Sequence, residues 1–226
     1  MIFSQKPRAV VFDMDGVLFN TEELYLEALV CAANGCGVEA PVELYTGSIG
    51  TSSEATRARL GAHYGDAVDM DLLWKSASEH FFKLADTRLC LKPGVVELLD
   101  LLDRLDLPAA IATSSKPENV DHHLGVHGLE RRFRAVAASG SYPRSKPHPD
   151  PFLTAARMLG ADPSFCIALE DSHTGVRSAS SAGMMTIMVP DLLEANEEMR
   201  GLCAHVAADL HEVARLIEDA IRGGGG

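Results

Sequence analysis

The sequence predicts an α/β fold, in which a core built on a parallel β-sheet carries an inserted, all-helical subdomain. Two observations lead to this prediction. Short apolar runs recur along the chain with helical segments between most of them, and such runs are typical of strands that are buried on both faces of a sheet. Between the first two runs, the roughly 65 residues from 21 to 86 hold helical patterns but no further run, and this stretch is too long for a simple crossover.

The predicted strands are the apolar runs themselves. The first of them, residues 9–12 (Ala-Val-Val-Phe), leads directly into Asp13. The others are residues 109–112, 135–138, 166–169, 186–189 and, as the weakest candidate, 206–207. Because strands that alternate with helices form βαβ units, we expect these runs to pair in one parallel sheet.

The helical segments divide between the core and the insertion. In the core, residues 93–105 begin with a proline in the first turn and continue with apolar residues at helical spacing. The other predicted core helices are residues 151–159, 174–182 and 210–221. The insertion holds predicted helices at residues 21–34, 52–64 and 69–84. We therefore assign residues 1–20 and 87–226 to the core and residues 21–86 to a helical cap.

The charge of the chain excludes a nucleic-acid partner. It has 20 Lys and Arg against 32 Asp and Glu, a formal net charge of −12, whereas phosphate backbones require a concentrated basic face. Residues 1–8 lack the apolar run of a signal peptide, and no stretch reaches the roughly 18 apolar residues of a membrane helix. The five cysteines form no Cys-x-x-Cys pair, which favours buried free thiols in a reduced, cytoplasmic protein. Nothing in the sequence demands more than a monomer.

Four short polar segments are expected at the carboxyl ends of the predicted strands. They are residues 13–16, 113–115, 145–147 and 170–172. In an open parallel sheet, ligands bind outside the carboxyl ends of the strands. We therefore expect the four segments to converge on one site, although they lie far apart in the sequence.

Asp13 and Asp15 are the sharpest of these signals. A carboxylate can attack phosphorus and form an aspartyl-phosphate, and a second carboxylate can protonate the leaving oxygen and later activate water. Gly16 allows the backbone to bend so that both side chains face one centre. Taken alone, Asp-x-Asp-Gly could also be a solvated turn. In combination with the other segments, the functional interpretation is favoured.

Glu170 and Asp171 add further oxygen ligands. Magnesium prefers carboxylates and water in its coordination shell, and several carboxylates gathered without a cation would repel one another. These residues, with Asp13 and the main-chain carbonyl of Asp15, therefore predict a Mg²⁺ site. The alternative is that the segment Glu170-Asp171-Ser172 only caps the helix that follows it.

Thr113, Ser114 and Lys146 are candidates for binding phosphate oxygens. Hydroxyl and main-chain N–H groups at the end of a strand can donate hydrogen bonds to an anion, and a positioned lysine can hold the nucleophile and the phosphate together. Taken singly, the first two would more simply cap a helix and the lysine would be solvated. Only in combination with the acidic segments do these three residues indicate a phosphate-binding site.

Together these motifs resemble the haloacid dehalogenase-like hydrolase superfamily. They follow one another in the same order as in that family, and the resemblance covers residues 10–189. The residues that carry the resemblance are Asp13-Met-Asp-Gly-Val-Leu, Thr113, Lys146-Pro147 and Glu170-Asp171-Ser172-x-x-Gly175-Val176. The resemblance implies a Rossmannoid core with a helical cap inserted after the first motif. The branch that looks most similar includes β-phosphoglucomutase, sugar-phosphate phosphatases and phosphoglycolate phosphatase.

The resemblance also implies a role for each motif. Asp13 is expected to be the nucleophile and Asp15 the general acid and base, while Thr113, Ser114 and Lys146 bind the phosphoryl group. The expected ligands of Mg²⁺ are Asp13, Asp15 through its carbonyl, Glu170 and Asp171. An aspartate at position 15 is similar to phosphatases and mutases and unlike dehalogenases and phosphonatases.

We therefore expect a Mg²⁺-dependent phosphatase that hydrolyses a small phosphorylated metabolite through an aspartyl-phosphate. Two alternatives stay open. A phosphomutase of the β-phosphoglucomutase type would return the phosphoryl group to another hydroxyl of the same sugar. A non-enzymatic phosphoacceptor similar to a response-regulator receiver is more remote, because receivers are shorter, have no cap and place their metal-binding carboxylates before the threonine and lysine.

The cap is expected to set specificity through the loop at residues 46–50. Gly47 and Gly50 permit a close approach of the backbone and Ser48 offers a hydroxyl, although the loop could also be a plain turn between helices. The nearest basic residue after it is Arg57, which argues against a mutase because caps of that type tend to carry one closer to the loop.

The remaining histidines and aromatic residues fit structural roles better than a site. The three histidines at residues 122, 123 and 127 are expected on a solvated helix face rather than on a metal. Trp74 and the Phe81-Phe82 pair are expected in the core of the cap.

Overall fold

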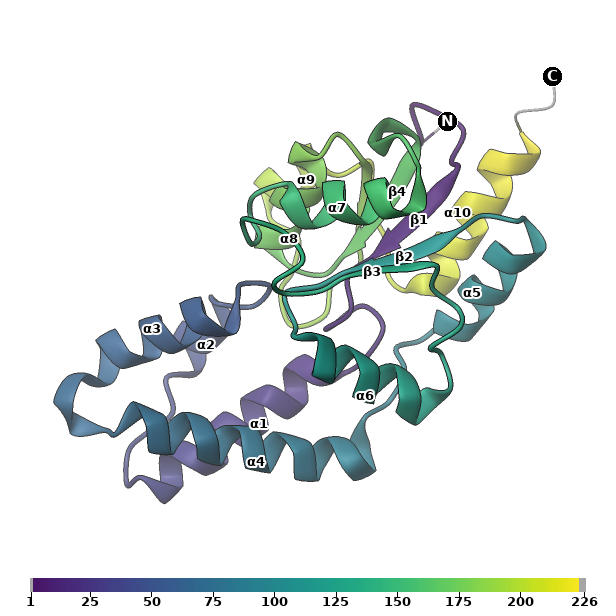
Figure 1. The fold of residues 1–226 in the computed structure, drawn as a ribbon. Helices are drawn as coiled ribbons and strands as arrows, with labels where there is room; N and C mark the ends of the chain where they lie inside the picture. Colours follow the sequence, from purple (N-terminus) through teal and green to yellow (C-terminus); the bar gives the residue numbers. More distant parts are fainter. Residues whose placement is uncertain (1, 224–226) are drawn as a thin grey trace.

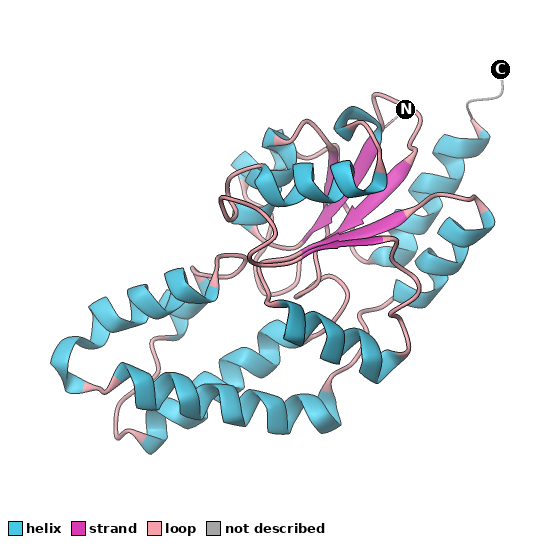
Figure 2. Ribbon diagram, in the orientation of Figure 1, coloured by secondary structure: helices cyan, strands magenta, loops and turns pink. Residues whose placement is uncertain are grey.

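The computed structural model describes residues 2–223 and shows a six-stranded sheet in which all strands are parallel (Figures 1 and 2). The strands are β1 (Ala9–Phe12), β2 (Ala109–Ala112), β3 (Ala135–Ala137), β4 (Cys166–Glu170), β5 (Met185–Met188) and β6 (His205–Val206). Their order across the sheet is β3-β2-β1-β4-β5-β6. Each strand begins and ends within one residue of the apolar run that predicted it.

The helices fall into two groups. Those connected to the sheet are α5 (Val95–Arg104), α6 (Pro117–His127), α7 (Asp150–Leu159), α8 (His173–Ser181), α9 (Glu197–Leu202) and α10 (Leu210–Arg222), with a short 3₁₀ turn η2 (Pro163–Phe165). Those of the insertion are α1 (Thr21–Gly35), α2 (Val42–Thr46), α3 (Ser53–Tyr64) and α4 (Met70–Arg88), with the 3₁₀ turn η1 (Gly65–Ala67). None of the helices within residues 2–223 is long and apolar enough to cross a membrane.

The alternation of side chains along β1 sorts the helices onto two faces of the sheet. Val10 and Phe12 belong to the apolar cluster that contains α5 and α10, whereas Ala9 and Val11 belong to the cluster that contains α7 and α8. Figure 1 shows these two pairs of helices on opposite sides of the sheet. The small residues on the α7 side include the alanines of β2, which let the helix backbones lie close to the strands.

The insertion is a layer of its own beyond the sheet. Figure 1 shows α1 to α4 together at one end of the molecule, with α1 beside α4 and α6 between them and the sheet. These helices have a separate apolar cluster that includes Leu29, Leu60 and Leu73. Helix α4 ends at Arg88, two residues beyond the limit predicted for the cap. Helices α2 and α9 were not expected, because five and six residues are too few to show a helical period.

The strand order places a site at the carboxyl ends of β1 and β4. Crossovers run from β1 outward to β2 and β3, and then return to β4 on the other side of β1. The connections therefore diverge between β1 and β4, and such a switch point leaves a crevice at the carboxyl edge of the sheet. The segments that follow these strands are residues 13–16 and 171–172.

Two predictions about residue types are wrong. The five cysteines are all free, but only Cys166 is buried, and Cys31 and Cys90 are exposed. The histidines of α6 do not form a solvated face, because His123 is fully buried between α6 and the junction of cap and core. Its ring lies 5.7 Å from that of Phe19 and 5.8 Å from that of Phe81. Sequence reasoning missed this since α6 faces the inserted helices, not only solvent.

Replacing His123 with leucine is expected to stabilise the fold. Neither ring nitrogen of His123 has a hydrogen-bond partner in residues 2–223, and burial lowers the pKa of the ring. We expect His123→Leu to raise the free energy of unfolding by about 1 kcal/mol at pH 7. The gain should increase as the pH falls below 6.5, because only the unfolded wild type then takes up the proton readily.

Denaturant unfolding at pH 5 and pH 7 measures this difference. The matched control is His122→Leu, at a neighbouring and partly exposed residue. A His123→Leu variant that is less stable than the wild type at both pH values would contradict the interpretation.

Candidate active site

The four polar segments meet at the carboxyl edge of the sheet. Asp13 follows β1, and its main-chain N–H donates to the carbonyl of Leu169 in β4 at 2.8 Å, so the two strands stay paired up to the site. Thr113 follows β2 in the same way and donates to the carbonyl of Ala137 at 3.0 Å. The convergence expected from a parallel sheet is therefore present.

Lys146 lies at the centre of this edge. Its side chain is 1% exposed, and its Nζ lies 2.7 Å from Asp13 Oδ1 and 2.5 Å from Glu170 Oε1. Burial alone would lower the pKa of the ammonium group, but the two carboxylates raise it, so the lysine stays protonated. Glu170 is fixed from the other side, because its second oxygen accepts from the N–H and hydroxyl of Ser172 at 3.1 and 3.0 Å.

Asp13, Glu170 and Asp171 form a buried carboxylate cluster, in which one oxygen of each lies within 4.8 Å of the others. Burial is the main cause that raises the pKa of Asp13, to about 8, and Lys146 only partly opposes it. Burial, followed by the charges of Glu170 and Asp13, also holds the pKa of Asp171 well above its usual range. Both oxygens of Asp171 are buried without a hydrogen-bond partner among the described residues.

A divalent cation fits this cluster. Oxygen donors at this spacing and two unpartnered buried oxygens on Asp171 suit a hard cation such as Mg²⁺. The position of the Asp171 carboxylate also explains why Gly16 follows the Asp-x-Asp motif. Its φ angle is +79°, and a Cβ there would collide with the carboxylate of Asp171.

Asp15 points away from the carboxylate cluster. Its Oδ2 accepts from the hydroxyl of Ser115 at 2.7 Å and from that of Thr113 at 3.4 Å, while its Oδ1 is buried without a partner in the described chain. The N–H of Ser115 in turn donates to the hydroxyl of Thr113 at 3.0 Å. The residues that follow β2 thus hold the side chain of Asp15 next to the carboxylate cluster but separate from it.

The predicted cap loop faces the site, and of its two glycines Gly50 makes the close approach to the core. The carbonyl of Gly50 accepts from the hydroxyl of Ser114 at 3.3 Å, and a Cβ on Gly50, whose φ angle is +77°, would collide with Ser172. Gly47 is exposed and lies away from the pocket, since its carbonyl accepts from Arg59 at 2.6 Å. Gly47 is therefore not among the residues that line the described pocket.

Ser48 is buried and lines the pocket, although its hydroxyl is already used. It donates to the carbonyl of Leu44 at 2.9 Å, within the cap. The other end of the loop is tied to the core by the hydroxyl of Thr174, which donates to the carbonyl of Ile49 at 3.0 Å. At this loop, cap and core therefore meet through main-chain carbonyls and not through the Ser48 side chain.

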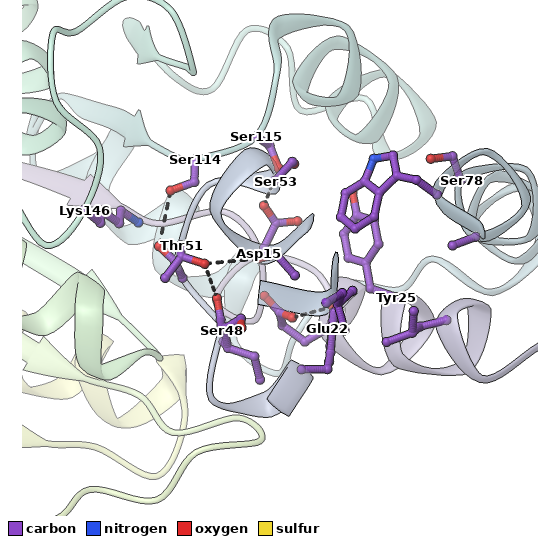
Figure 3. Close-up of a pocket in the computed structure, with 18 of the residues that line it drawn as sticks. Asp15, Glu22, Tyr25, Ser48, Thr51, Ser53, Ser78, Ser114, Ser115 and Lys146 are labelled. Carbon is purple, nitrogen blue, oxygen red and sulfur yellow. Dashed lines mark hydrogen bonds between the residues drawn. The ribbon is translucent and has the colours of Figure 1, made fainter. Parts of the chain in front are cut away.

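A pocket of about 120 Å³ extends from the carboxylates into the cap. Figure 3 shows Lys146 and Ser114 at one end, Asp15 in the middle, and Tyr25 and Ser78 at the other end. Sequence reasoning missed three groups of its lining: Ser115, which holds Asp15; Glu22 and Tyr25 on α1; and Trp74 on α4, which had been assigned to the core of the cap.

Glu22 is the most unusual of the missed residues. It is buried in the first turn of α1, and its Oε2 accepts from the hydroxyl of Tyr45 at 3.3 Å. Burial is the first cause that raises its pKa to about 8, and the charges of Asp15 and Asp13 add to it. In the sequence, Glu22 and Glu23 look like ordinary acidic residues at a helix N-terminus, so only the direction of α1 distinguishes them.

Comparison with known proteins agrees with this geometry. The sequence profile of the haloacid dehalogenase-like hydrolase family matches residues 10–189. The chain belongs to this family. Protein CbbY of Cupriavidus necator is 30% identical over 214 residues, which cover 86% of this chain and 82% of CbbY. Hexitol phosphatase B of Escherichia coli O157:H7 is 30% identical over 210 residues, which cover 88% of this chain and 90% of that phosphatase.

The fold is similar as well. The crystal structure of CbbY from Rhodobacter sphaeroides in complex with phosphate superposes with a TM-score of 0.76 at 26% identity. The match covers 92% of this chain and 96% of the CbbY chain. The parallel sheet and the inserted helices are therefore features that this member shares with its family.

The raised pKa of Glu22 predicts a pH-dependent loss of stability. In the folded chain Glu22 stays protonated up to about pH 8, whereas in the unfolded chain it ionises near 4.5. The wild type should therefore lose stability relative to Glu22→Gln between these pH values, by about 1.4 kcal/mol for each pH unit.

Unfolding in EDTA-containing buffer from pH 5 to pH 8 tests this expectation. Glu23→Gln, at the exposed neighbour in the same helical turn, is the matched control and should keep the wild-type profile. Parallel profiles for the wild type and Glu22→Gln would show that the carboxyl is not held in its neutral form.

Proposed function

We propose that this chain is a Mg²⁺-dependent phosphatase of small phosphorylated metabolites, which works through a phosphorylated Asp13. The observation that carries the proposal is the contact of Asp13 with Lys146 beside the carboxylate cluster, with Asp15 held separately by Ser115. A nucleophile, a cation to hold the phosphoryl oxygens, and an independent proton carrier are the groups that this reaction needs.

In the first step, Asp13 attacks phosphorus and the bond between phosphorus and the alcohol oxygen breaks. Asp15 gives its proton to the leaving oxygen, so that a neutral alcohol departs. Lys146 and Ser114 stabilise the negative charge on the phosphoryl oxygens. The hydrogen bonds from Thr113 and Ser115 keep Asp15 directed into the pocket.

In the second step, Asp15 takes a proton from water, which attacks the phosphorus of the aspartyl-phosphate. The bond from phosphorus to Asp13 breaks, and inorganic phosphate is released with the carboxylate restored. The residues that would hold Mg²⁺ are Asp13, Glu170, Asp171 and the carbonyl of Asp15. When bound, the cation neutralises carboxylate and phosphoryl charge.

The insertion would act as a cap, with residues 21–86 closing over the core formed by residues 1–20 and 87–226. Every residue of the site comes from one chain, so the proposal requires no more than a monomer. Five free cysteines are compatible with the reducing cytoplasm. The phosphatase named among the relatives supports a small phosphorylated metabolite as substrate.

The cap argues for hydrolysis over the mutase alternative. A mutase must rebind a bisphosphate and therefore needs a second anion site. Arg57 does not provide one here, since it pairs with Asp71 and lines a neighbouring cavity. Lys146 is the only Lys or Arg among the residues that line the described pocket.

Substitution of the two aspartates tests the mechanism. Asp13→Asn should abolish phosphate release, because it removes the nucleophile while keeping the size of the side chain. Asp15→Asn should lower kcat by roughly 10²- to 10⁴-fold, through loss of the proton carrier. Phosphate release from a panel of metabolite phosphates with Mg²⁺ is the measurement.

Asp66→Asn, in an exposed turn of the insertion, is the matched control and should keep full activity. Near-normal turnover in Asp13→Asn would reject the nucleophile, and no release by the wild type from any ester would reject the phosphatase.

The unpartnered carboxylate of Asp171 predicts a metal effect on stability. Mg²⁺ at about 100 times its dissociation constant should stabilise the wild type by about 2.7 kcal/mol. Asp171→Asn should lose this effect, since an amide cannot balance the charge of the cation. Thermal unfolding with and without Mg²⁺ is the measurement, with Asp66→Asn again as the control. An equal shift in Asp171→Asn would remove Asp171 from the metal site.

A further inference from the structure

The far wall of the pocket is apolar. Beyond Asp15 and Glu22 the lining passes to Leu29 of α1, Leu60 of α3 and to Trp74 and Ala77 of α4. We call these four residues the cap chamber. They belong to the apolar cluster of the insertion, in which Leu29 and Leu60 are almost fully buried, so the cap chamber is a notch in that cluster that opens toward the catalytic aspartates.

Two of the hydroxyls that line the pocket beside the cap chamber, those of Thr51 and Ser48, are paired within the protein. Thr51 Oγ1 donates to the carbonyl of Ser48 at 2.5 Å and also lies 3.1 Å from Thr56 Oγ1. Ser48 itself donates to the carbonyl of Leu44. A sugar hydroxyl that entered the chamber would lose its water and would find side-chain hydroxyls only at Ser53 and Ser78, which penalises a polyol with several hydroxyls. An apolar group would lose nothing of this kind.

Charge also selects against a second phosphate. Lys146 is bound by Asp13 and Glu170, and the cap adds no cation to the lining of the pocket. Glu22 contributes a carboxyl group instead. A bisphosphate would therefore have to reach the neighbouring cavity, where Arg57 and Lys116 lie.

The size of the pocket limits the alcohol. Its volume is about 120 Å³, and an apolar cavity of roughly 150 Å³ holds a molecule the size of benzene. Asp13 and Lys146 define the phosphoryl end, which takes part of this volume, so the opposite end can take only a compact group.

We propose that the preferred substrates are phosphomonoesters whose alcohol carries one compact apolar group, either a single ring or a short branched alkyl chain, and that Trp74 and Ala77 select it. This inference rests on the proposed phosphatase function and adds the class of leaving group. It differs from a sugar-phosphate specificity, in which polar side chains of the cap would bind hydroxyls.

The test compares esters of primary alcohols, so that the leaving groups differ in the body of the alcohol more than in its oxygen. Benzyl phosphate and 3-methylbutyl phosphate carry apolar groups, ribose 5-phosphate and glycerol 3-phosphate carry hydroxyls, and ethyl phosphate is too short to fill the cap chamber. With Mg²⁺, we expect kcat/KM for the two apolar esters to exceed that for the hydroxylated esters at least tenfold.

Variants of the cap chamber separate selection from catalysis. Trp74→Ala removes the partly exposed indole, and Ala77→Leu fills the chamber. Each should raise KM for benzyl phosphate by roughly tenfold or more with little change in kcat, and should leave kcat/KM for ethyl phosphate unchanged. Leu72→Asn, at a residue of α4 that is 58% exposed, is the matched control. Thermal unfolding confirms that each variant is folded.

The outcomes distinguish the two proposals. No hydrolysis of any ester, ethyl phosphate included, would reject the phosphatase function itself. If ribose 5-phosphate or a pentose 1,5-bisphosphate is hydrolysed in preference to benzyl phosphate, the proposed selection of an apolar group by the cap chamber is rejected. The phosphatase function is then retained. Unchanged KM values for benzyl phosphate in both folded variants would overturn the proposed selection as well.

Discussion

The buried ammonium group of Lys146 is the interaction on which the site depends. Asp13, Glu170 and Asp171 are packed at the end of a sheet where water is excluded, and their mutual repulsion would otherwise push the loops apart. Lys146 offsets part of that repulsion by pairing with two of the three, and Asp171 is left for a cation. A strongly acidic chain can in this way keep a centre that attracts a phosphate anion.

The core and the cap divide the work of the proposed reaction. The core holds the groups that act on phosphorus: Asp13 and Ser114 lie just after β1 and β2, and Lys146 lies in the loop between β3 and α7. The cap reaches the same pocket from α1, α3 and α4, and it contacts the core both through apolar side chains such as Phe81 and through main-chain carbonyls at Ile49 and Gly50. The cap helices that line the pocket carry none of the three carboxylates of the cluster.

Sequence reasoning succeeded where local chemistry is enough. The strands were predicted because each is a continuous apolar run, and the carboxylates of Asp13 and Asp171 were expected to lie together because they stand where such runs end. It failed for His123, which was assigned to a solvated face, and it missed that Trp74, which packs against the cap core as expected, also lines the pocket. Both depend on which element packs opposite them, and a helical period does not contain that information.

By itself the sequence determined where the strands lie along the chain, which family the chain resembles and which residues can act on a phosphoryl group. These follow from the hydrophobic pattern and the motifs. Only the tertiary structure decided that Gly50 rather than Gly47 approaches the core, that Ser115 orients Asp15 and that Glu22 enters the pocket. The physical reason is that these contacts join segments brought together by folding, and their strength depends on distance and burial, which no single segment encodes.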